Sequence, residues 1–140
     1  MRYWDASAVV PLLVHEPRTA DALASLEEDT GIVTWWGTRI ECTSAIARLE
    51  RSGFLSARQA AQATEVLRSL AGGWNEILAT EAVRETACRL LRVHALRAAD
   101  AMQLAAATVM AGGRPTHVGF LAFDERLRDA AAREGFSVGP

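Results

Sequence analysis

The sequence predicts an α/β fold, in which a mainly parallel sheet of four to five strands carries helices on both faces. Short apolar segments rich in β-branched and aromatic residues, such as "GIVTW" (31–35), alternate with longer segments whose apolar residues have helical spacing. One or more predicted helices separate successive strands, as in right-handed crossovers between parallel strands. The length of 140 residues suits a single domain with one sizeable core, so we treat residues 1–140 as one domain.

Five segments are predicted strands because they are short, apolar and bounded by turn or cap residues. The first begins at Arg2, and the last covers the final apolar residues of the sequence. The predicted strands cover residues 2–5, 31–35, 75–80, 117–124 and 136–139.

Seven segments are predicted helices. Asp5 or Ser7 can cap the first helix, and Pro11 lies late for its first turn. Ser56 is a good cap for the fourth, and glycine pairs at 72–73 and 112–113 end two others. The predicted helices cover residues 8–15, 18–28, 36–51, 56–72, 81–95, 97–111 and 125–135.

The composition excludes several kinds of chemistry. The chain contains no lysine, so all 15 basic residues are arginine, and sites built on a P-loop or Schiff-base lysine are excluded. The three histidines and two cysteines have no metal-ligand spacing. A formal net charge of −2 argues against nucleic-acid binding by bulk positive charge, unless divalent cations bind to the acids and reverse the sign locally. Any chemistry must therefore use carboxylates, hydroxyls or arginines.

Two aspartates follow predicted strands. Asp5 ends the first strand, and Asp124 ends the strand over 117–124. The carboxyl ends of parallel strands meet at one edge of the sheet, which is where sites form in such folds. Each aspartate also has a purely structural interpretation as the N-cap of the helix that follows it.

Two further acids lie on predicted helices. Asp100 interrupts the alanine-rich segment "RAADAMQLAAATVMA" (97–111), whose apolar residues surround the whole helix and predict burial. A favourable helix dipole or a pair with Arg97 would explain this carboxylate structurally. Glu41 lies on a helix face made of small and polar residues, which fits either a solvated surface or the close approach of a ligand.

The four acids together suggest a metal site. Carboxylates packed into one cleft repel one another and raise one another's pKa unless a cation neutralises them. Ligand sets made only of oxygen suit Mg²⁺ or Mn²⁺. The sequence therefore predicts that Asp100 is tolerated in an apolar helix because it is a metal ligand.

Four segments, "YWDASAVVPLL", "RIECTSAIARLER", "LRAADAMQLAAA" and "FLAFDERL", resemble the motifs of PIN-domain nucleases, in particular the VapC-type toxins of bacterial toxin–antitoxin pairs. The resemblance covers essentially the whole chain, with the motifs in the family's order. It places the family's four catalytic acids on Asp5, Glu41, Asp100 and Asp124. One position departs from the pattern: Ala122 stands where the family usually has threonine or serine, two residues before the last acid.

The resemblance implies an endoribonuclease that cleaves RNA with a metal-activated water. Asp5, Asp100 and Asp124 would be the metal ligands for Mg²⁺, with Mn²⁺ as a substitute, and Glu41 would help bind a second ion or orient water. Ser7 matches a hydroxyl residue near the metal site, and Arg97 would contact phosphate or pair with Asp100. The implied partners are a VapB-type antitoxin, an RNA substrate and a second copy of the chain. We expect a cytoplasmic protein that does not bind a membrane.

Two other functions remain open from the sequence: a nuclease of the same fold that processes RNA without an antitoxin, and a catalytically silent binding domain. The adjacent Trp35 and Trp36 also remain open. Either both belong to the core, or one of them anchors a dimer or an antitoxin.

Overall fold

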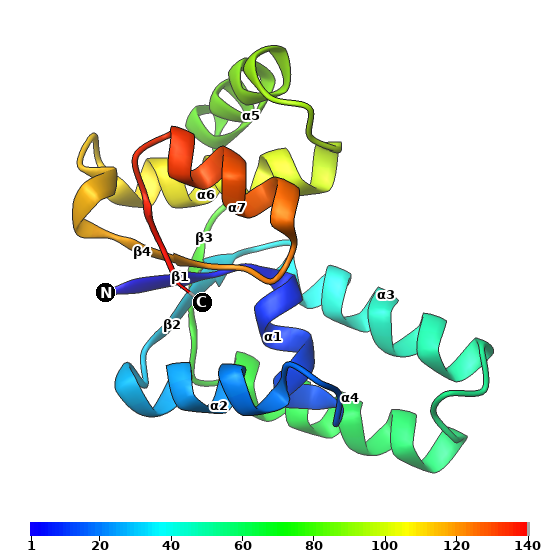
Figure 1. Ribbon diagram of the computed structural model, residues 1–140. Coiled ribbons are helices and arrows are strands. Elements are labelled where there is room, and N and C mark those ends of the chain that lie inside the picture. Colours follow the sequence, from blue (N-terminus) through cyan, green and yellow to red (C-terminus); the bar gives the residue numbers. More distant parts are fainter. Residues whose placement is uncertain (140) are drawn as a thin grey trace.

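The computed structural model describes residues 1–139 and has a single five-stranded sheet, all of it parallel, in the order β3-β2-β1-β4-β5 (Figure 1). The first strand is central because it pairs with both β2 and β4. The predicted fold class is confirmed. The strands are β1 (Arg2–Trp4), β2 (Ile32–Trp35), β3 (Asn75–Ile77), β4 (Gly119–Leu121) and β5 (Ser137–Val138).

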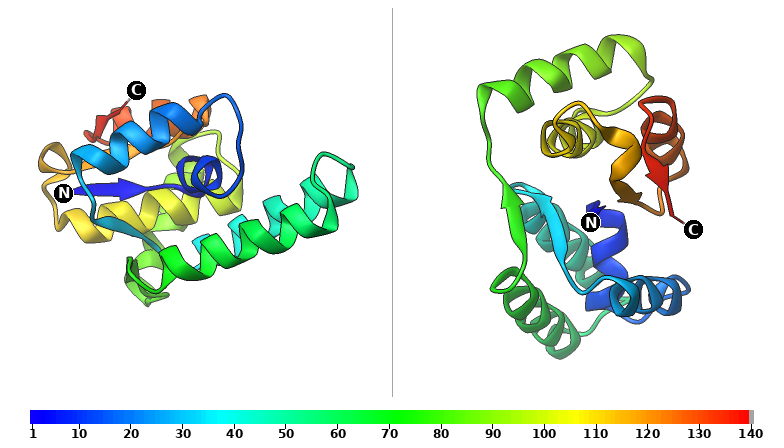
Figure 2. Two further views of the ribbon diagram at one scale, coloured as in Figure 1. Left: turned by 90° about the horizontal axis from the view of Figure 1, so that it is seen from below. Right: turned by 90° about the vertical axis from the view of Figure 1, so that its left-hand side faces the viewer.

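Helices cover both faces of this sheet. In Figures 1 and 2, α5, α6 and α7 lie on one face, while α1, α2 and α4 lie on the other, and α3 and α4 form a hairpin that projects past the sheet. Within residues 1–139, every helix is too short or too polar to span a bilayer. The helices are α1 (Ala6–Leu13), α2 (Thr19–Glu28), α3 (Thr38–Arg51), α4 (Ala57–Ala71), α5 (Glu81–Val93), α6 (Ala98–Ala111) and α7 (Glu125–Arg133), with a 3-10 turn over Pro115–His117.

Alternation along the central strands divides the core into two layers. Successive side chains of a strand point to opposite faces. Tyr3 and Phe120 accordingly pack with α5, α6 and α7, whereas Trp4 and Leu121 pack with α1, α3 and α4. The central strands are buried on both sides, so their sequences are continuously apolar rather than alternating.

The predicted elements are all present, but several bounds differ. The first helix begins at Ala6 because Asp5 is its N-cap, and it continues through Pro11. The strand predicted over 117–124 is only three residues long, since the chain before it forms the 3-10 turn and the chain after it turns out of the sheet toward Asp124. Ser56 caps α4 as predicted, in a reciprocal capping box with Gln59.

Glu134, at the end of α7, ties that helix to α5. Its carboxylate accepts hydrogen bonds from Arg89 Nη2 and His94 Nε2, both at 2.7 Å. The hydrogen bond from Arg89 holds the pKa of Glu134 below its ordinary value, and His94 adds to the effect. The side chains of Glu134 and His94 are only 15% and 6% exposed, so the contact is poorly accessible to water.

We expect Glu134→Ala to lower the free energy of unfolding by about 1–3 kcal/mol, because it leaves partly buried donors without an acceptor. Urea denaturation at pH 7 measures the loss. Glu65→Ala is the control, because Glu65 forms an exposed pair with Arg68 within one helix, and such pairs contribute little. Equal losses in the two variants would contradict the prediction. Because the pKa of Glu134 is lowered in the folded state, its contribution to stability depends on pH. The stabilisation is present above pH ~4 and disappears as the pH falls through the folded-state pKa of Glu134.

Candidate active site

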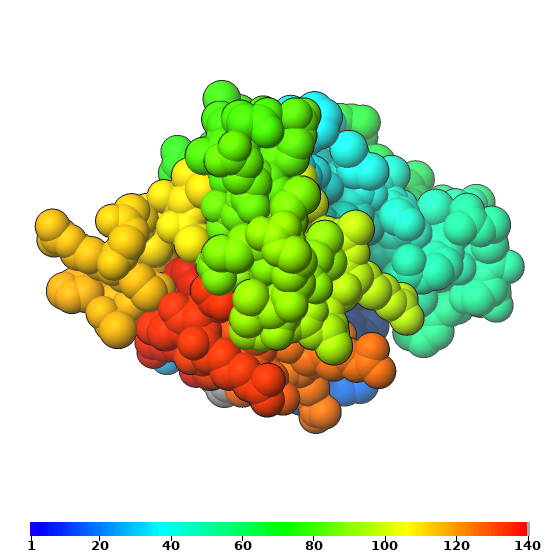
Figure 3. Space-filling model, turned by 90° about the horizontal axis from the view of Figure 1, so that it is seen from above, coloured from blue at the N-terminus to red at the C-terminus, as the bar shows by residue number. Residues whose placement is uncertain are grey.

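The four predicted acids, Asp5, Glu41, Asp100 and Asp124, line one cleft at the carboxyl end of the sheet. Each comes from a different element: the end of β1, the first turn of α3, the first turn of α6 and the N-cap of α7. Figure 3 shows the mouth of this cleft from above, where α3 (cyan), the start of α6 (yellow-green) and the start of α7 (orange) surround the blue of the N-terminal segment. The parallel topology therefore brings together residues that span 120 positions of the sequence.

Asp5 is the most deeply buried of the four, at 4% exposed. Its Oδ2 accepts hydrogen bonds from the backbone N–H of Ser7 at 2.9 Å and from the Ser7 hydroxyl, so it is indeed an N-cap. Burial raises the pKa of Asp5 to about 6, against the hydrogen bonds from Ser7 and with a further contribution from the charge of Asp100. Capping and a place in the cleft are compatible, because the cap turns this carboxylate toward the carboxyl end of the sheet.

Ser7 connects two parts of the site. Its Oγ donates to Asp5 and accepts a hydrogen bond from the backbone N–H of Phe123 at 2.9 Å. This links the β1–α1 junction to the segment that leads into Asp124. Ser7 therefore connects the carboxylate of Asp5 to the backbone that leads into Asp124.

Asp124 is exposed and lies three residues beyond β4. Its Oδ1 accepts a hydrogen bond from the backbone N–H of Leu127 at 2.9 Å, which makes it the N-cap of α7. Ala122, where the sequence departs from the resembled pattern, is fully buried in the core layer that contains Tyr3 and Phe120. A hydroxyl at that position would lie in apolar surroundings.

The environment of Asp100 differs from the one predicted. The helix is buried over most of Ala101–Ala107, as expected, but Asp100 stands in the exposed first turn and is only half-buried. Burial and the charge of Asp124 raise its pKa, while the backbone N–H and the charge of Arg97 oppose that rise. Within residues 1–139, no ion pair joins Asp100 to an arginine. The structural explanation by a salt bridge with Arg97 is therefore not seen.

Glu41 is half-buried rather than solvated. Its Oε1 accepts a hydrogen bond from Gln103 Nε2 at 2.9 Å. Burial and the charge of Asp5 raise its pKa to about 7, against the hydrogen bond from Gln103. The sequence does not predict the contact with Gln103, although a fully buried amide in an alanine-rich helix, three residues after Asp100, is a signal of it.

Three arginines surround the mouth of the cleft: Arg48, Arg97 and Arg126. Only Arg97 is predicted from the sequence. Arg48 lies seven residues after Glu41, two turns along the same face of α3, and Arg126 lies two residues after Asp124, so the sequence spacing from a predicted acid could have indicated both arginines. Positive side chains beside clustered carboxylates suit a long anionic ligand that reaches past the acids to the arginines.

The donor set fits a hard divalent cation in its chemistry but is not arranged as a finished metal site. Within residues 1–139, no three acidic, histidine or cysteine side chains are placed to hold a metal ion. The hydrogen bonds explain this, because Ser7, Gln103 and Leu127 each hold one carboxylate in the cleft. Burial, together with the charges of neighbouring acids, raises the pKa values of Asp5, Glu41 and Asp100, and a bound cation would oppose both effects.

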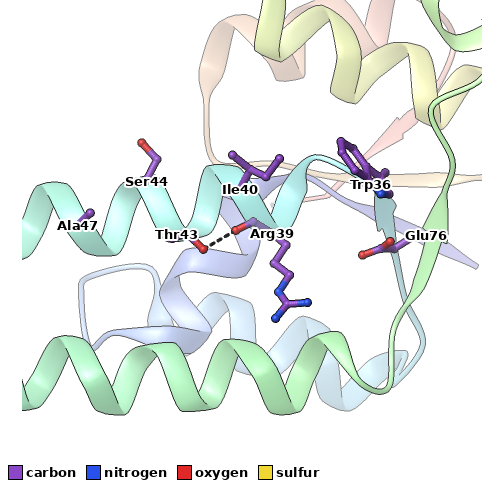
Figure 4. Close-up of a pocket in the computed structure, with 7 residues that line it drawn as sticks. All are labelled: Trp36, Arg39, Ile40, Thr43, Ser44, Ala47 and Glu76. Carbon is purple, nitrogen blue, oxygen red and sulfur yellow. Dashed lines mark hydrogen bonds between the residues drawn. The ribbon is translucent and has the colours of Figure 1, made fainter.

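A second pocket adjoins the cleft along α3. It contains one of the two tryptophans, Trp35 and Trp36, whose roles the sequence leaves undecided. Trp35 is 8% exposed and belongs to the core, whereas Trp36 is 51% exposed. Figure 4 shows Trp36 and Ile40 pointing to the same side of α3, with the Arg39 guanidinium directed away from them. Ile40 lines both pockets, so this apolar surface, which we call the Trp36 surface (Trp36 and Ile40), is continuous with the acidic cleft.

Comparison with known proteins agrees with this geometry. The PIN domain family matches residues 2–133. Ribonuclease VapC45 from Mycobacterium tuberculosis (strain CDC 1551 / Oshkosh) and Ribonuclease VapC49 from Mycobacterium tuberculosis (strain ATCC 25618 / H37Rv) are each 35% identical to this chain over 141 residues, covering 99% of this chain and 94% of each relative. The fold is similar to that in the crystal structure of FitAcB from Neisseria gonorrhoeae, with a TM-score of 0.69 and 18% identity over 100% of this chain and 97% of that one. The chain therefore belongs to the PIN domain family.

Proposed function

We propose that this protein is a metal-dependent endoribonuclease and the toxin of a toxin–antitoxin pair. The observation that carries the proposal is the cleft itself, in which four acids from four elements lie together at the carboxyl end of a parallel sheet. Its relatives that are named ribonucleases support RNA as the substrate. The same relatives carry VapC names, which supports a VapB-type antitoxin as partner.

Asp5, Asp100 and Asp124 are the proposed ligands of Mg²⁺, for which Mn²⁺ can substitute, and Glu41 orients the attacking water. The bound cation would supply a water of lowered pKa and positive charge against the leaving oxygen. Two neighbouring residues position these acids by hydrogen bonds: Ser7 holds Asp5, and Gln103 holds Glu41. Arg48, Arg97 and Arg126 line the mouth of the cleft, and we expect them to contact the phosphates that flank the cleaved bond.

The test of the proposed function is cleavage of a structured RNA mixture by the antitoxin-free protein in Mg²⁺, in Mn²⁺ and in EDTA. We expect cleavage in both metals and none in EDTA. Isothermal titration calorimetry with Mn²⁺, in the same buffer without EDTA, distinguishes two reasons for an absence of cleavage. A protein that binds Mn²⁺ but cleaves nothing has a narrower substrate than the mixture contains, whereas a folded protein that neither binds Mn²⁺ nor cleaves would overturn the proposal in favour of a silent binding domain.

Arg97 is proposed to contact phosphate. In an inactive Asp5→Asn background, Arg97→Ala should weaken RNA binding and reduce the slope of log K against log salt by about 0.7, the value for one lost single-strand phosphate contact. Fluorescence anisotropy at several salt concentrations measures the slope. Arg58→Ala, an exposed arginine of α4 that does not line the cleft, is the control. A slope left unchanged by Arg97→Ala would show that Arg97 acts only on Asp100.

We also propose that the Trp36 surface contacts a second copy of the chain. Trp36 and Ile40 are 51% and 61% exposed, and a contiguous apolar surface is typical of a protein interface. Trp36→Glu should convert a dimer to a monomer in size-exclusion chromatography with light scattering. Leu23→Glu, an equally exposed apolar residue on α2, should leave the mass unchanged. A monomeric parent protein, or a Trp36→Glu dimer, would contradict this assignment.

A further inference from the structure

A chain of buried polar side chains runs beneath the acidic cleft and ends at one of its carboxylates. Tyr3, Thr34, Thr38 and Gln103 are all fully buried, and they come from β1, β2, α3 and α6. Polar groups in the core lose their hydrogen bonds to water, so each must be satisfied by a protein partner. The hydrogen bonds join Tyr3 Oη to Gln103 Oε1 (2.7 Å), Gln103 Nε2 to Thr38 Oγ1 (3.0 Å) and to Glu41 Oε1 (2.9 Å), Thr38 Oγ1 to Thr34 Oγ1 (2.6 Å), and Thr34 Oγ1 to the Trp4 carbonyl (2.7 Å).

The partners fix the direction of every hydrogen bond in this chain. A backbone carbonyl only accepts, so the Thr34 hydroxyl donates its proton to Trp4 and accepts from Thr38. Thr38 has then used its only proton and accepts from the amide nitrogen of Gln103. That nitrogen has two protons, and the second is donated to Glu41.

Tyr3 fixes the amide from the other side. Its phenol donates to Gln103 Oε1, which matches the orientation that Thr38 sets, because Thr38 donates its only proton to Thr34 and can only accept from Gln103. Reversing the amide would place an oxygen against the Glu41 carboxylate and leave the phenol and Thr38 without their partners. The nitrogen of Gln103 therefore faces the cleft because the core determines it, not because the side chain is free to choose.

A purely structural role does not explain why this series of hydrogen-bonded side chains ends at Glu41. Linking α6 to β1 and α3 requires only the hydrogen bonds among Tyr3, Thr38 and Gln103, and any acceptor in the core could satisfy the second proton of the Gln103 amide. The additional contact reaches a half-buried carboxylate of the cleft. It leaves Glu41 as an acceptor held at a fixed distance from the rigid core.

We propose that Gln103 is a positioning residue for RNA cleavage: its amide nitrogen, oriented by Tyr3 and Thr38, holds the Glu41 carboxylate in place in the cleft. The inference rests on the proposed function, in which Glu41 orients water. Gln103 itself touches no substrate in this role. Loss of a comparable supporting hydrogen bond beside a reacting group lowers activity by about 10- to 100-fold.

The experiment compares Gln103→Leu with Leu104→Ala under saturating and limiting RNA. Both residues are fully buried in α6, but only Gln103 reaches the cleft. We expect Gln103→Leu to lower kcat by about 10- to 100-fold with little change in KM. Leu104→Ala should lower the melting temperature yet retain the parent kcat at temperatures where it is folded. Tyr3→Phe, which keeps Gln103 but removes the donor to its oxygen, should give a smaller loss of kcat in the same direction.

A second measurement does not depend on activity. The side-chain NH₂ signals of Gln103 in a ¹H–¹⁵N spectrum should exchange slowly with water in the parent protein, and Glu41→Ala should shift one of the two signals and accelerate its exchange. If the folded parent neither binds Mn²⁺ nor cleaves RNA, the proposed function fails, while this spectrum still tests the contact between Gln103 and Glu41. Parent-like kcat in folded Gln103→Leu, or Gln103 signals that Glu41→Ala does not move, would overturn the inference.

Discussion

Replacing Asp100 by asparagine should lower RNA cleavage by at least about 100-fold, since supporting hydrogen bonds alone are worth 10- to 100-fold and a direct ligand is worth more. The substitution changes charge and hardly changes shape. Asp100 is half-buried in the exposed first turn of α6, so the variant should retain the parent fold and melting behaviour. Rates from a fluorescent RNA substrate in Mg²⁺, together with a circular dichroism spectrum, measure both expectations.

Asp5→Asn should give a loss of similar size. Asparagine is as good an N-cap as aspartate, so the hydrogen bond from the backbone N–H of Ser7 is kept while the negative charge is lost. Asp21→Asn is the matched control, because Asp21 lies on α2 in a surface pair with Arg18 and outside the cleft. Near-parent rates in either Asp100→Asn or Asp5→Asn would show that the acidic cleft has been assigned wrongly.

The features of the fold that repeat along the chain could be predicted from sequence. Alternating strand and helix segments determine a parallel sheet, and a parallel sheet brings Asp5 and Asp124 to the same edge. Ser56 sets the start of α4 because its side chain satisfies a free backbone donor there, whereas the sequence leaves Asp5 and Ser7 open as caps of α1 and predicts its start two residues late. Local chemistry was sufficient for these features.

Features that depend on long-range packing could not be predicted. Asp100 looks buried in its helix because the periodicity does not show that the first turn of α6 lies beyond its packing partners. The sequence leaves open whether Glu41 lies on a solvated face or beside a ligand, because its buried neighbour Gln103 is 62 residues away in sequence. Which of Trp35 and Trp36 enters the core depends on the direction in which the chain leaves β2, and adjacency alone does not determine that.

The acids of the cleft should destabilise the protein at neutral pH in the absence of metal. Burial raises the pKa of Asp5 to about 6, and burial together with the charge of Asp5 raises that of Glu41 to about 7. A carboxyl whose pKa is higher in the folded state binds its proton more tightly there than in the unfolded chain. The contribution of these two groups to stability is therefore most favourable below pH ~4, falls as the pH rises to about 7, and is constant above that.

Asp5→Asn should consequently stabilise the metal-free protein at pH 8 while abolishing its activity. Because the pKa of Asp5 is about 6 in the folded protein and 3.8 in its ordinary state, the expected gain is on the order of 3 kcal/mol. Removal of the Asp5 charge also lowers the pKa of Glu41, so the gain extends over the same pH range. Urea denaturation of parent and variant in EDTA at several pH values measures the difference, which should be close to zero near pH 4 and reach its full size above pH ~7.

Comparison with the parent at each pH is essential, because other carboxyls titrate with the opposite sign. Glu134, whose pKa is lowered by Arg89, loses its stabilising effect as the pH falls, and this loss is the same in parent and variant. Added Mg²⁺ should raise the melting temperature of the parent at pH 8 far more than that of Asp5→Asn, because a cation compensates the charge that the variant lacks. A difference between parent and variant that is independent of pH would show that Asp5 acts through its hydrogen bonds to Ser7 alone. A difference that grows from pH 4 to pH 7 ties the cost in stability to the charge that the proposed catalysis requires.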